Sequence, residues 1–553
     1  MGGKNKGTVE QSLIIVDEVK GCVVEELMRS SGFSNCKPLP PNDRLSIASK
    51  PTPQEFHMTT HSPKPDPSSA FDIDLHHKYL HNRRTKIVAT IGPSCSSPAQ
   101  LRALVSGGLD VARINFSHGT AEDHVKTIRL IRKIAGQLKK NVAILGDLCG
   151  PKIRVGEFAN GSIVLKENTT VFITTKPVIG SESLIPSQYK NLVHEVVPGH
   201  SILLDDGNLE LKVIRKNKDK VEAKVIHGGI LKDHKGMNLP NTKLGVAALT
   251  AKDKDDVLYC IKAEVDYVAL SFVRRAGDIT NLKSWLARNG SEIPVIAKIE
   301  MPEALENIHA IMGLADGIMV ARGDLGVELP AKKVPIIQNK LIQIANAMNK
   351  PVIVATQMLE SMIEHSRPTR AEVTDVAGAC LACADAVMLS GETAVGKYPL
   401  ETFETMDSIL RETEAYQFFS QGGGFGKNHR DCANGLLGAI GEATAQLSRD
   451  LMVHSIFVLT VSGYTARIVS SDRPAAPIMA LTQSQTVARR MQLFWGVYPR
   501  LVKKAMTTHD YLIYGERIIK EHHLAKEGDF VIMISGLADI GAKATAIMVH
   551  KVG

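Results

Sequence analysis

The chain has 553 residues, of which 44% are hydrophobic and 22% charged, which is typical of a globular protein with two to four domains. Its formal net charge of +8 (66 basic and 58 acidic residues) is spread along the chain, which excludes a basic tail and favours small anionic substrates at least as much as nucleic acid. No apolar run approaches the ~20 residues of a membrane span and the first residues lack the layout of a signal peptide, so we expect a cytoplasmic protein with neither a membrane nor a nucleic acid as partner.

Residues 1–84 differ from the rest of the chain. They are rich in Pro, Ser and Thr and show little periodicity, as in "CKPLPPNDRLSIASKPTPQEF", so we expect a mostly disordered extension. Residues 9–29 are an exception, because their pattern allows a short amphipathic helix.

After residue 84, short β-rich runs alternate with amphipathic helical stretches. Each run is almost continuously apolar, as expected of a parallel strand that is covered on both faces. In one helical stretch, Thr369 and Glu372 have the spacing of a capping box at a helix start. The predicted strands are residues 86–92, 111–117, 142–148, 267–273, 294–300, 317–323, 351–357 and 386–392.

Eight such repeats predict an α/β fold, a (β/α)8 TIM barrel that closes on itself. The interval between the third and fourth runs, residues 149–266, is much longer than the others. Most of it alternates apolar and polar residues between Gly, Asn and Asp turns, which indicates an antiparallel β domain. Because this insertion leaves the C-terminal end of a barrel strand, we expect it above the barrel mouth, where barrels keep their active sites.

Polar residues stand at the ends of seven of the eight predicted strands. Since these ends meet at one rim of a barrel, we expect the side chains to converge on one site. One such charge alone would more often be a structural ion pair, but the repetition favours a functional site. The residues are Arg113, Asn115, Ser117, Asp147, Ser271, Lys298, Glu300, Arg322, Asp324, Thr356, Ser390 and Glu392.

These residue types indicate a particular chemistry. Glu300 and Asp324 follow neighbouring strands and are suited to share a Mg²⁺ or Mn²⁺ ion that keeps open positions for substrate oxygens. The turn "ARGDLG" can hold an anion with its backbone N–H groups. A metal, Lys298 and the arginines Arg113 and Arg154 would suit phosphoryl transfer, in which the protein mainly positions and neutralises charge. The same groups can also stabilise an enolate.

The two cysteines Cys380 and Cys383 form a lone C-x-x-C sequence. The chain has eight cysteines scattered along its length, which does not indicate a disulfide framework. Since this pair lies in a helical pattern with no second pair, burial in apolar surroundings is favoured over a metal or redox site.

Several long motifs resemble the pyruvate kinase family. The resemblance runs from about Thr85 to the C terminus. It implies a barrel at 85–149 and 248–425, an inserted antiparallel β-barrel lid at 150–247 and a C-terminal three-layer α/β domain at 426–553, and it also implies a homotetramer. The motifs are "TIGPSC", "RINFSHG", "GDLCGPKIR", "AKIEMPEALENI", "VARGDLGVE", "ATQMLESMIEHSRPTRAEV" and "DAVMLSGETAVGKYPLETF".

The resemblance implies that phosphoenolpyruvate donates its phosphoryl group to ADP in the last step of glycolysis. Glu300 and Asp324 would bind the divalent ion that chelates phosphoenolpyruvate. Lys298 would contact the phosphoryl group in transfer and stabilise the enolate, and Arg113 would contact the phosphate.

Further roles follow from the same resemblance. Thr356 would lie near the proton path to the enolate carbon, and Ser390 and Glu392 would support the site. The substrate carboxylate would be received by Gly323, Asp324 and Thr356. The nucleotide side would be formed by Asn115, His118, Arg154 and Lys235.

One motif departs from the family pattern. Potassium-dependent members typically carry Thr, Lys and Glu where this chain has Leu148, Cys149 and Lys152. We hypothesise that the ammonium group of Lys152 replaces the potassium ion, so that K⁺ is not required. The alternative is that Lys152 is a solvated hinge charge and that potassium still binds. The monovalent site of the family corresponds to Asn115, Ser117, Asp147 and the carbonyl of Leu148.

Residues 426–553 alternate predicted helices with the runs 455–461, 477–482 and 529–536. The loop 460–467 follows a strand and opens a helix, a geometry that binds phosphate. In the family the matching loop holds a phosphorylated effector. Val461 stands where some sugar-bisphosphate-regulated relatives have lysine, which favours a sugar or nucleoside monophosphate; a loop that only caps the helix is the alternative. The residues of this loop expected to bind are Thr460, Ser462, Gly463 and Thr465.

Two other interpretations stay open. An aldolase or lyase that uses phosphoenolpyruvate or pyruvate can share a barrel with metal-binding carboxylates, but it gives no reason for the lid or for "RINFSHG". A catalytically inactive relative that serves as a binding or regulatory protein would be expected to have lost Lys298, Glu300 or Asp324, and all three are present.

Overall fold

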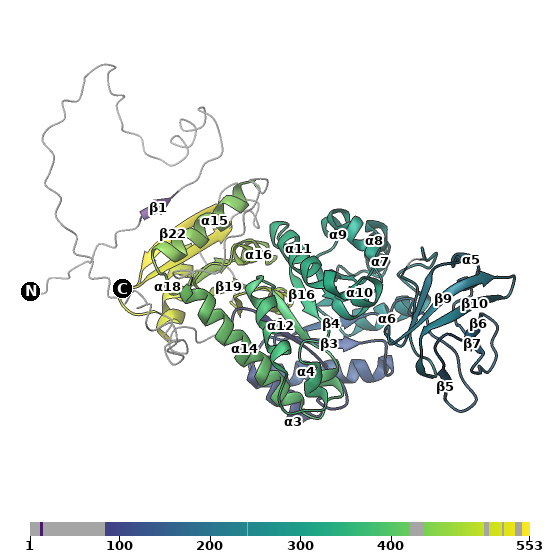
Figure 1. Ribbon diagram of the computed structural model, residues 1–553. Coiled ribbons are helices and arrows are strands. Elements are labelled where there is room, and N and C mark those ends of the chain that lie inside the picture. Colours follow the sequence, from purple (N-terminus) through teal and green to yellow (C-terminus); the bar gives the residue numbers. More distant parts are fainter. Residues whose placement is uncertain are drawn as a thin grey trace, which may run out of the picture.

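The computed structural model describes residues 12–14, 83–240, 242–420, 435–502, 508–521, 525–536 and 545–553. A β-rich domain lies at one end of the molecule, a barrel in the middle and an α/β domain at the other end (Figure 1). Most of the extension, including most of the helix expected at 9–29, lies outside the described residues. The described part of the expected helix, Ser12–Ile14, is strand β1 paired with β22 (Thr545–Lys551), so the helix prediction is wrong there.

The predicted eight-stranded parallel barrel is confirmed, closing in the order β13-β14-β15-β16-β17-β2-β3-β4. Side chains alternate along each strand: Val88 and Val111 belong to the cluster inside the barrel, whereas Ile87 and Ala112 pack in the layer between strands and helices. Both layers are apolar, which explains the continuous apolar runs. The strands are β2 (Lys86–Thr90), β3 (Val111–Asn115), β4 (Ala143–Asp147), β13 (Tyr267–Leu270), β14 (Val295–Ile299), β15 (Gly317–Ala321), β16 (Val352–Ala355) and β17 (Ala386–Leu389).

Every barrel strand ends before its predicted end. Most of the polar residues at those ends therefore begin the loops at the barrel mouth. In two of these loops the backbone enters the left-handed region, with φ of 54° at Phe272 and 71° at Thr356. A strand cannot continue through that conformation, so the chain turns there.

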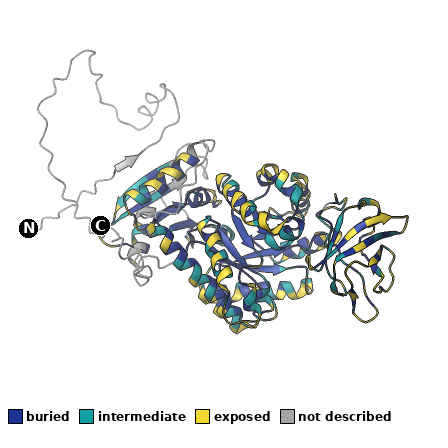
Figure 2. Cartoon of the chain, viewed as in Figure 1, coloured by how far each residue is buried: buried dark blue, intermediate teal, exposed yellow. Residues whose placement is uncertain are grey.

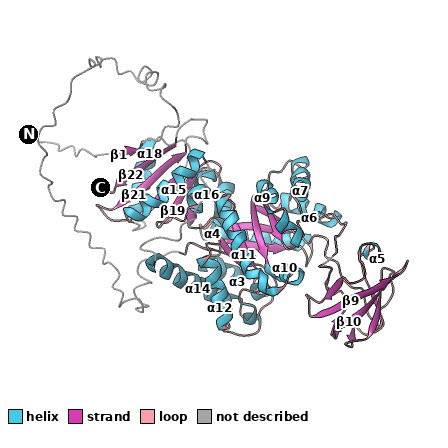
Figure 3. Ribbon diagram, turned by 45° about the horizontal axis from the view of Figure 1, so that its top comes forward, coloured by secondary structure: helices cyan, strands magenta, loops and turns pink. Residues whose placement is uncertain are grey.

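Helices surround the barrel, with buried faces toward the strands and exposed faces outward (Figures 2 and 3). The capping box is confirmed, since Thr369 and Glu372 bond to each other's backbone N–H. Cys380 and Cys383 are both buried, and burial raises the pKa of each thiol, in agreement with the apolar interpretation. The covering helices are α3 (Pro98–Gly107), α4 (Ala121–Gln137), α6 (Ala251–Lys262), α7 (Ala276–Arg288), α8 (Pro302–Glu306), α9 (Ile308–Leu314), α10 (Arg322–Glu328), α11 (Val334–Ala347), α12 (Arg370–Leu381), α13 (Gly391–Ala394) and α14 (Pro399–Ser420), with 3₁₀ turns at Ala331–Lys333 and Glu360–Ile363.

The inserted domain is the predicted antiparallel β lid, in the form of a curled, open half-barrel. One sheet has the order β12-β8-β9-β10-β6-β7, in which only β6 and β7 are parallel neighbours, and β5 pairs with β11 in a separate ribbon. On β10, Val221, Ala223 and Val225 face the core of the lid. The elements are β5 (Ser162–Leu165), β6 (Thr170–Thr174), β7 (Leu184–Pro186), α5 (Leu192–Glu195), β8 (Ser201–Leu204), β9 (Leu209–Lys216), β10 (Lys220–His227), β11 (Gly229–Lys232) and β12 (Met237–Asn238).

The C-terminal domain has a mixed sheet in the order β1-β22-β21-β18-β19-β20. The three predicted runs form β18 (Ile456–Leu459), β19 (Ile478–Thr482) and β21 (Phe530–Gly536). Two further strands, β22 and β20 (Val497–Leu501), were not predicted from the sequence. β20 contains Pro499, which lacks an N–H donor and suits the sheet edge where β20 lies. The helices are α15 (Gly435–Asp450), α16 (Tyr464–Ser471), α17 (Gln485–Arg490) and α18 (Thr508–Glu521), with a 3₁₀ turn at Met491–Leu493.

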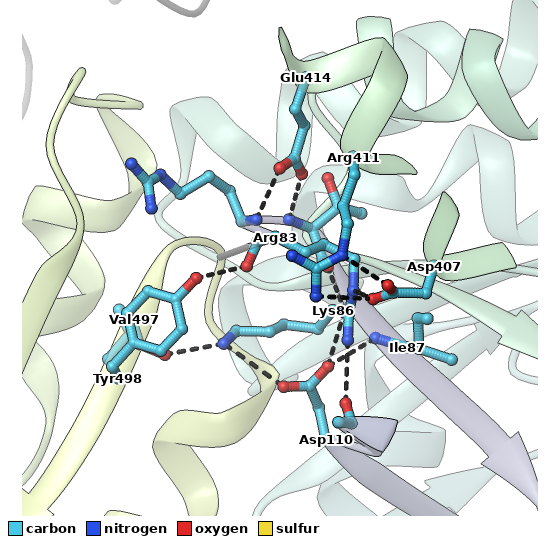
Figure 4. Close-up of polar contacts among 12 residues, drawn as sticks. Arg83, Lys86, Ile87, Asp110, Asp407, Arg411, Glu414, Val497 and Tyr498 are labelled. Carbon is cyan, nitrogen blue, oxygen red and sulfur yellow. Dashed lines mark hydrogen bonds and ion pairs between the residues drawn. The ribbon is translucent and has the colours of Figure 1, made fainter. Parts of the chain in front are cut away.

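The start of the barrel is fixed between α14 and the C-terminal domain (Figure 4). The two carboxylate oxygens of Glu414 on α14 accept hydrogen bonds from the backbone N–H groups of Arg84 and Thr85, at 2.7 and 2.6 Å. Lys86, which is 1% exposed, donates to the carbonyl of Val497 on β20 at 2.8 Å. Arg84, which the sequence analysis assigned to the extension, is thus buried at a domain junction.

Every helix in the described part of the chain is too short or too polar to cross a bilayer.

Candidate active site

The loops after the barrel strands meet the lid around a cleft at the barrel mouth. The cleft has a volume of about 620 Å³ and lies between a lid loop and the loops that follow β15, β16 and β17. Four of the twelve polar residues predicted at the strand ends, Arg322, Asp324, Thr356 and Ser390, line this cleft. Residues that line the cleft include Lys152, Asp206, Arg322, Gly323, Asp324, Thr356 and Ser390.

Lys298, near the end of β14, lies between two carboxylates. Its Nζ atom is 2.9 Å from Glu300 Oε1 and 3.3 Å from Asp147 Oδ1, and it donates to Ser271 Oγ at 2.7 Å. Burial disfavours the ammonium ion, but the two carboxylates outweigh this effect and raise the pKa of Lys298 above its ordinary value. Lys298 is therefore a fixed cation at neutral pH.

Asp147 holds a second cation, Arg113. Arg113 Nε lies 2.7 Å from Asp147 Oδ2, and Arg113 Nη1 donates to Thr90 Oγ1 at 2.9 Å. Burial opposes the ionisation of Asp147, yet Lys298 and Arg113 lower the pKa of its carboxyl group below the usual range. One buried aspartate therefore positions both cations that the sequence analysis assigned to the phosphoryl group.

The two carboxylates expected at the metal site follow neighbouring strands. Glu300 follows β14, and its Oε2 atom accepts a hydrogen bond from Phe272 N at 2.7 Å. Asp324 lies in the first turn of α10, after β15. Burial raises the pKa of Glu300, Lys298 partly offsets this, and the like charge of Asp324 raises it further. The two carboxylates therefore repel each other, and a cation between them would relieve that repulsion.

Thr356 has a conformation that is rare for a β-branched residue, with φ of 71°. Its Oγ1 atom accepts a hydrogen bond from Gly323 N at 2.7 Å and donates to the carbonyl of Ala355 at 2.6 Å. Arg322 donates to the carbonyl of Thr356 at 2.6 Å and pairs with Asp375 on α12, also at 2.6 Å. These contacts hold the strained residue so that its hydroxyl lies at the start of α10.

Glu392 is fully buried and joins two mouth loops. Its carboxylate accepts hydrogen bonds from Ser390 N at 2.6 Å and from Leu359 N at 3.2 Å. Glu392 thus contacts backbone rather than the cleft, whereas Ser390 lines the cleft.

Of the four residues expected on the nucleotide side, Asn115 ends β3 and His118 lies in the loop after it, whereas Arg154 and Lys235 lie near the beginning and the end of the lid. Arg154 donates to the carbonyl of His234 at 2.9 Å, and Lys235 pairs with Asp205 at 2.6 Å. Burial lowers the pKa of His118, and the positive charges of Arg154, Lys152 and Arg113 lower it further. Asn115 accepts a hydrogen bond from Ser117 N at 3.1 Å.

Lys152 lies at the lid–barrel cleft. Its Nζ atom is 4.0 Å from Asp206 Oδ1, and its charge contributes to the lowered pKa of His118. In the described part of the chain, no ion pair or hydrogen bond joins Lys152 to the four residues of the family's monovalent site. Among those four residues, Asp147 forms ion pairs with Arg113 and Lys298. The carbonyl of Leu148 accepts a hydrogen bond from Ser271 Oγ at 2.8 Å.

The loop expected to bind an effector lies between β18 and α16, as predicted. Gly463 caps α16 with φ of 91°, and its N–H donates to Thr460 Oγ1 at 2.9 Å. Thr460 and Thr465 are buried, whereas Val461 and Ser462 are exposed. An anion would therefore first meet Ser462 and the backbone of the loop.

One contact between the lid and α10 was not predicted from the sequence. Asn238 Nδ2 donates to Glu328 Oε1 at 3.0 Å. Both residues belong to short motifs, "HKGMNLP" and "VARGDLGVE", which could have drawn attention to them. Their proximity depends on how the lid is placed on the barrel, which no local pattern shows.

The chain matches two protein families along most of its length. Residues 82–403 match "Pyruvate kinase, barrel domain" and residues 438–549 match "Pyruvate kinase, alpha/beta domain". The chain belongs to the pyruvate kinase family. It is therefore a phosphotransferase, and the resemblance noted from the motifs is confirmed.

Curated pyruvate kinases and a solved structure agree with this membership. Pyruvate kinase 2 of Synechocystis sp. is 45% identical over 458 residues, covering 82% of this chain and 76% of that protein. The pyruvate kinase of Geobacillus stearothermophilus is 43% identical, covering 82% of this chain and 78% of that protein. A crystal structure of a pyruvate kinase from Cryptosporidium parvum superposes with a TM-score of 0.79 and 34% identity, covering 87% of this chain and 98% of that one.

Proposed function

We propose that this pyruvate kinase transfers the phosphoryl group of phosphoenolpyruvate to ADP in the cleft below the lid. The bond between phosphorus and the enol oxygen breaks, a bond to an ADP phosphate oxygen forms, and the enolate takes a proton at its methylene carbon to give pyruvate. The observation that carries this proposal is the pair of fixed cations, Lys298 and Arg113, held by Asp147. They can neutralise the charge on the phosphoryl and enolate oxygens.

The remaining groups of the cleft would place the rest of the substrate. We assign the substrate carboxylate to the backbone of Gly323 and Asp324 and to the hydroxyl of Thr356, which already meet at the start of α10. The same hydroxyl would lie near the proton path to the enolate carbon. Nucleotide binding is assigned to Asn115, His118, Arg154 and Lys235, and lid closure would exclude water from the transferring group.

The donor set fits Mg²⁺ or Mn²⁺ bound by Glu300 and Asp324. These hard cations take one or two protein carboxylates and complete their shell with water and substrate oxygens. The described residues hold no cluster of three or more His, Cys, Asp or Glu ligands, which agrees with such an open site. When bound, the ion supplies positive charge to the phosphate oxygens.

The assignment is tested by the formation of ATP and pyruvate from phosphoenolpyruvate, ADP and Mg²⁺. We expect turnover by the full chain, and Asp324→Asn should lose Mn²⁺-dependent binding of phosphoenolpyruvate. If the wild-type chain is folded but inactive, the alternative of a regulatory relative takes the place of this proposal.

We further propose that the enzyme does not require potassium, because Lys152 supplies a covalent positive charge at the cleft. Its position near Asp206 and its effect on His118 support a charge that acts on the nucleotide side of the cleft. Activity in a potassium-free tetramethylammonium buffer should equal activity with potassium. Lys152→Glu should create potassium dependence; full activity of this variant without potassium would contradict the role of Lys152.

A phosphorylated effector is proposed at the loop of Thr460, Ser462, Gly463 and Thr465, with a homotetramer as the assembly. A monophosphate fits a loop in which Val461 is exposed and adds no charge. We expect sugar or nucleoside monophosphates to shift the phosphoenolpyruvate saturation curve and Ser462→Asp to abolish the shift. A curve that no phosphorylated metabolite changes would leave this loop as a helix cap.

A further inference from the structure

Glu328 is a buried carboxyl group at the end of α10. It is 8% exposed, and only one of its oxygens, Oε1, accepts a hydrogen bond, from Asn238 of the lid at 3.0 Å. The other oxygen, Oε2, is buried and has no hydrogen-bond partner among the residues that the structure describes. A buried, half-satisfied carboxyl group destabilises a fold. Its presence at the contact between lid and barrel therefore points to a role in the working of the enzyme.

The helix that carries Glu328 also carries Asp324. The two residues are four positions apart in α10, so they lie on the same face of one helical turn, ~6 Å apart along the axis. A seven-residue helix moves as one unit, so a displacement at its first turn also moves its last residue. The metal and substrate side of the cleft is thereby joined to the lid through a single short element.

The lid and α10 also meet through a small cavity and an apolar contact, in addition to the hydrogen bond between Asn238 and Glu328. A cavity of about 20 Å³, room for about one water molecule, is lined by Lys152, Asn238, Asp324 and Glu328. A Cβ atom on Gly207 of the lid would lie 3.7 Å from Val327 Cγ1, so the lid loop packs against α10. These neighbours fill space, whereas the hydrogen bond gives one defined position of the lid on α10.

We propose that the Glu328–Asn238 hydrogen bond couples binding at the Asp324 site to the position of the lid and so to nucleotide binding. Glu328 is then a positioning residue that acts through Asn238. This inference rests on the proposed role of Asp324. Since coupling between two ligands is reciprocal, phosphoenolpyruvate should lower the Kd of the nucleotide, and the nucleotide should lower the Kd of phosphoenolpyruvate.

The test is a double-mutant cycle with Glu328→Ala, Asn238→Ala and the double variant in the full chain. In the wild type, KM for ADP should fall about fivefold or more between low and saturating phosphoenolpyruvate. Each single variant should lose this dependence, and the double variant should behave like the single ones. Glu328→Gln keeps an acceptor for Asn238 and should restore the coupling. Glu306→Ala, at an exposed glutamate of α8, is the matched control.

Three outcomes would overturn the inference. The first is that Glu328→Ala lowers the melting temperature but leaves the dependence of KM for ADP on phosphoenolpyruvate intact, which would make the contact purely structural. The second is that Glu328→Ala abolishes Mn²⁺-dependent binding of phosphoenolpyruvate, which would place Glu328 in the substrate site itself. The third is additive losses in the double variant, which would mean that the two residues act separately. If Glu328→Ala does not fold, Asn238→Ala and Glu328→Gln still test the coupling.

Failure of the proposed function gives a different result. In that case Asp324→Asn would leave phosphoenolpyruvate binding unchanged, whatever the variants of Glu328 do.

Discussion

At the scale of single residues, buried charges at the barrel mouth are set by their neighbours rather than by solvent. Lys298 and Arg113 share the carboxylate of Asp147, so their positions and their ionisation depend on one buried group. Glu328 shows the opposite situation, because its one hydrogen-bond partner in the described part of the chain, Asn238, is neutral. Two predictions follow from these environments.

Replacing Lys298 by Met should remove the cation with little change in shape. We expect kcat to fall about 10²–10³-fold, the usual cost of losing one transition-state charge contact. The coupled assay of pyruvate formation measures this. Lys340→Met, at an exposed lysine of α11, should keep wild-type activity; a Lys298→Met variant that does the same would remove Lys298 from the mechanism.

The stability contribution of Glu328 should depend on pH. Burial raises its pKa to about 7, Asn238 partly offsets this, and the charges of Glu303 and Asp324 add to the increase. Since the unfolded group ionises near 4.5, the folded state becomes progressively less stable between pH 4.5 and 7 and stays so above pH 7.

Glu328→Gln, which stays neutral, should therefore match the wild type near pH 4.5 and exceed its free energy of unfolding by up to about 3 kcal/mol at pH 8. Calorimetry in EDTA from pH 4.5 to 8 measures the difference. A difference that does not change with pH would contradict the raised pKa.

At the scale of elements, the same hydrogen bond between an aspartate side chain and a strand backbone is repeated at the base of the barrel. Each of the strands β3, β13, β15 and β17 is directly preceded by an aspartate. The Oδ2 atom of each aspartate accepts a hydrogen bond from a backbone N–H at or next to the start of a neighbouring strand. The N–H groups belong to Ile87, Ile144, Val295 and Val352. The aspartates are Asp110, Asp266, Asp316 and Asp385. Side-chain carboxylates thus fix the strand ends opposite the active site.

Asp385 has an additional role, because it also pairs with two arginines of the C-terminal domain. Arg467 Nη1 and Arg473 Nη1 lie 2.6 and 3.3 Å from Asp385 Oδ1, and all three side chains are buried. Asp385→Asn should keep the bond to the strand but leave both arginines without a counterion, which costs about 3–5 kcal/mol of stability. Asp316→Asn, whose partner Lys283 is partly exposed, should cost at most about 1 kcal/mol.

The pH dependence of this junction has the opposite sign to that of Glu328. Burial opposes ionisation, but Arg467 and Arg473 lower the pKa of Asp385. The contribution of Asp385 to the free energy of unfolding is therefore complete above the ordinary aspartate pKa. It is lost as the pH falls through the lowered pKa of the folded state. The difference between Asp385→Asn and the wild type in calorimetry should shrink only in strong acid.

At the scale of the whole molecule, the lid and the C-terminal domain lie at opposite ends of the barrel (Figure 1). The lid meets the mouth through hydrogen bonds such as those of Asn238 to Glu328 and of Arg274 to the carbonyls of Leu244 and Val246. The C-terminal domain meets the base through buried ion pairs and through the stretch that Glu414 holds (Figure 4). We therefore expect the lid to move more readily than the C-terminal domain.

Glu414→Ala should loosen the base of the molecule. Two buried backbone N–H groups would lose their acceptor, each at roughly 1–3 kcal/mol. The melting temperature should fall, and hydrogen exchange at residues 84–88 should become faster. Glu404→Ala, an exposed neighbour on α14, is the control; unchanged exchange in Glu414→Ala would show that other contacts hold this stretch.

The sequence by itself determined the barrel and most of its rim. A parallel strand covered on both faces must be apolar throughout, and its C-terminal end must reach the mouth. Eight apolar runs, seven of them with polar ends, therefore predict both the architecture and residues such as Lys298 and Asp324. The position of the lid followed from one long interval between runs. Strand ends were predicted too late, because left-handed turns at Phe272 and Thr356 leave no mark in hydrophobicity.

Only the tertiary structure decided which side chains meet. Asp147 joins Arg113 to Lys298, and Asn238 meets Glu328, although these pairs lie 34 to 151 residues apart in the chain. Such pairs depend on how whole elements are placed against one another, and an isolated polar residue carries no local signal of its distant partner. The strand β20 was missed for a similar reason, since only its position at a sheet edge explains why it can contain Pro499.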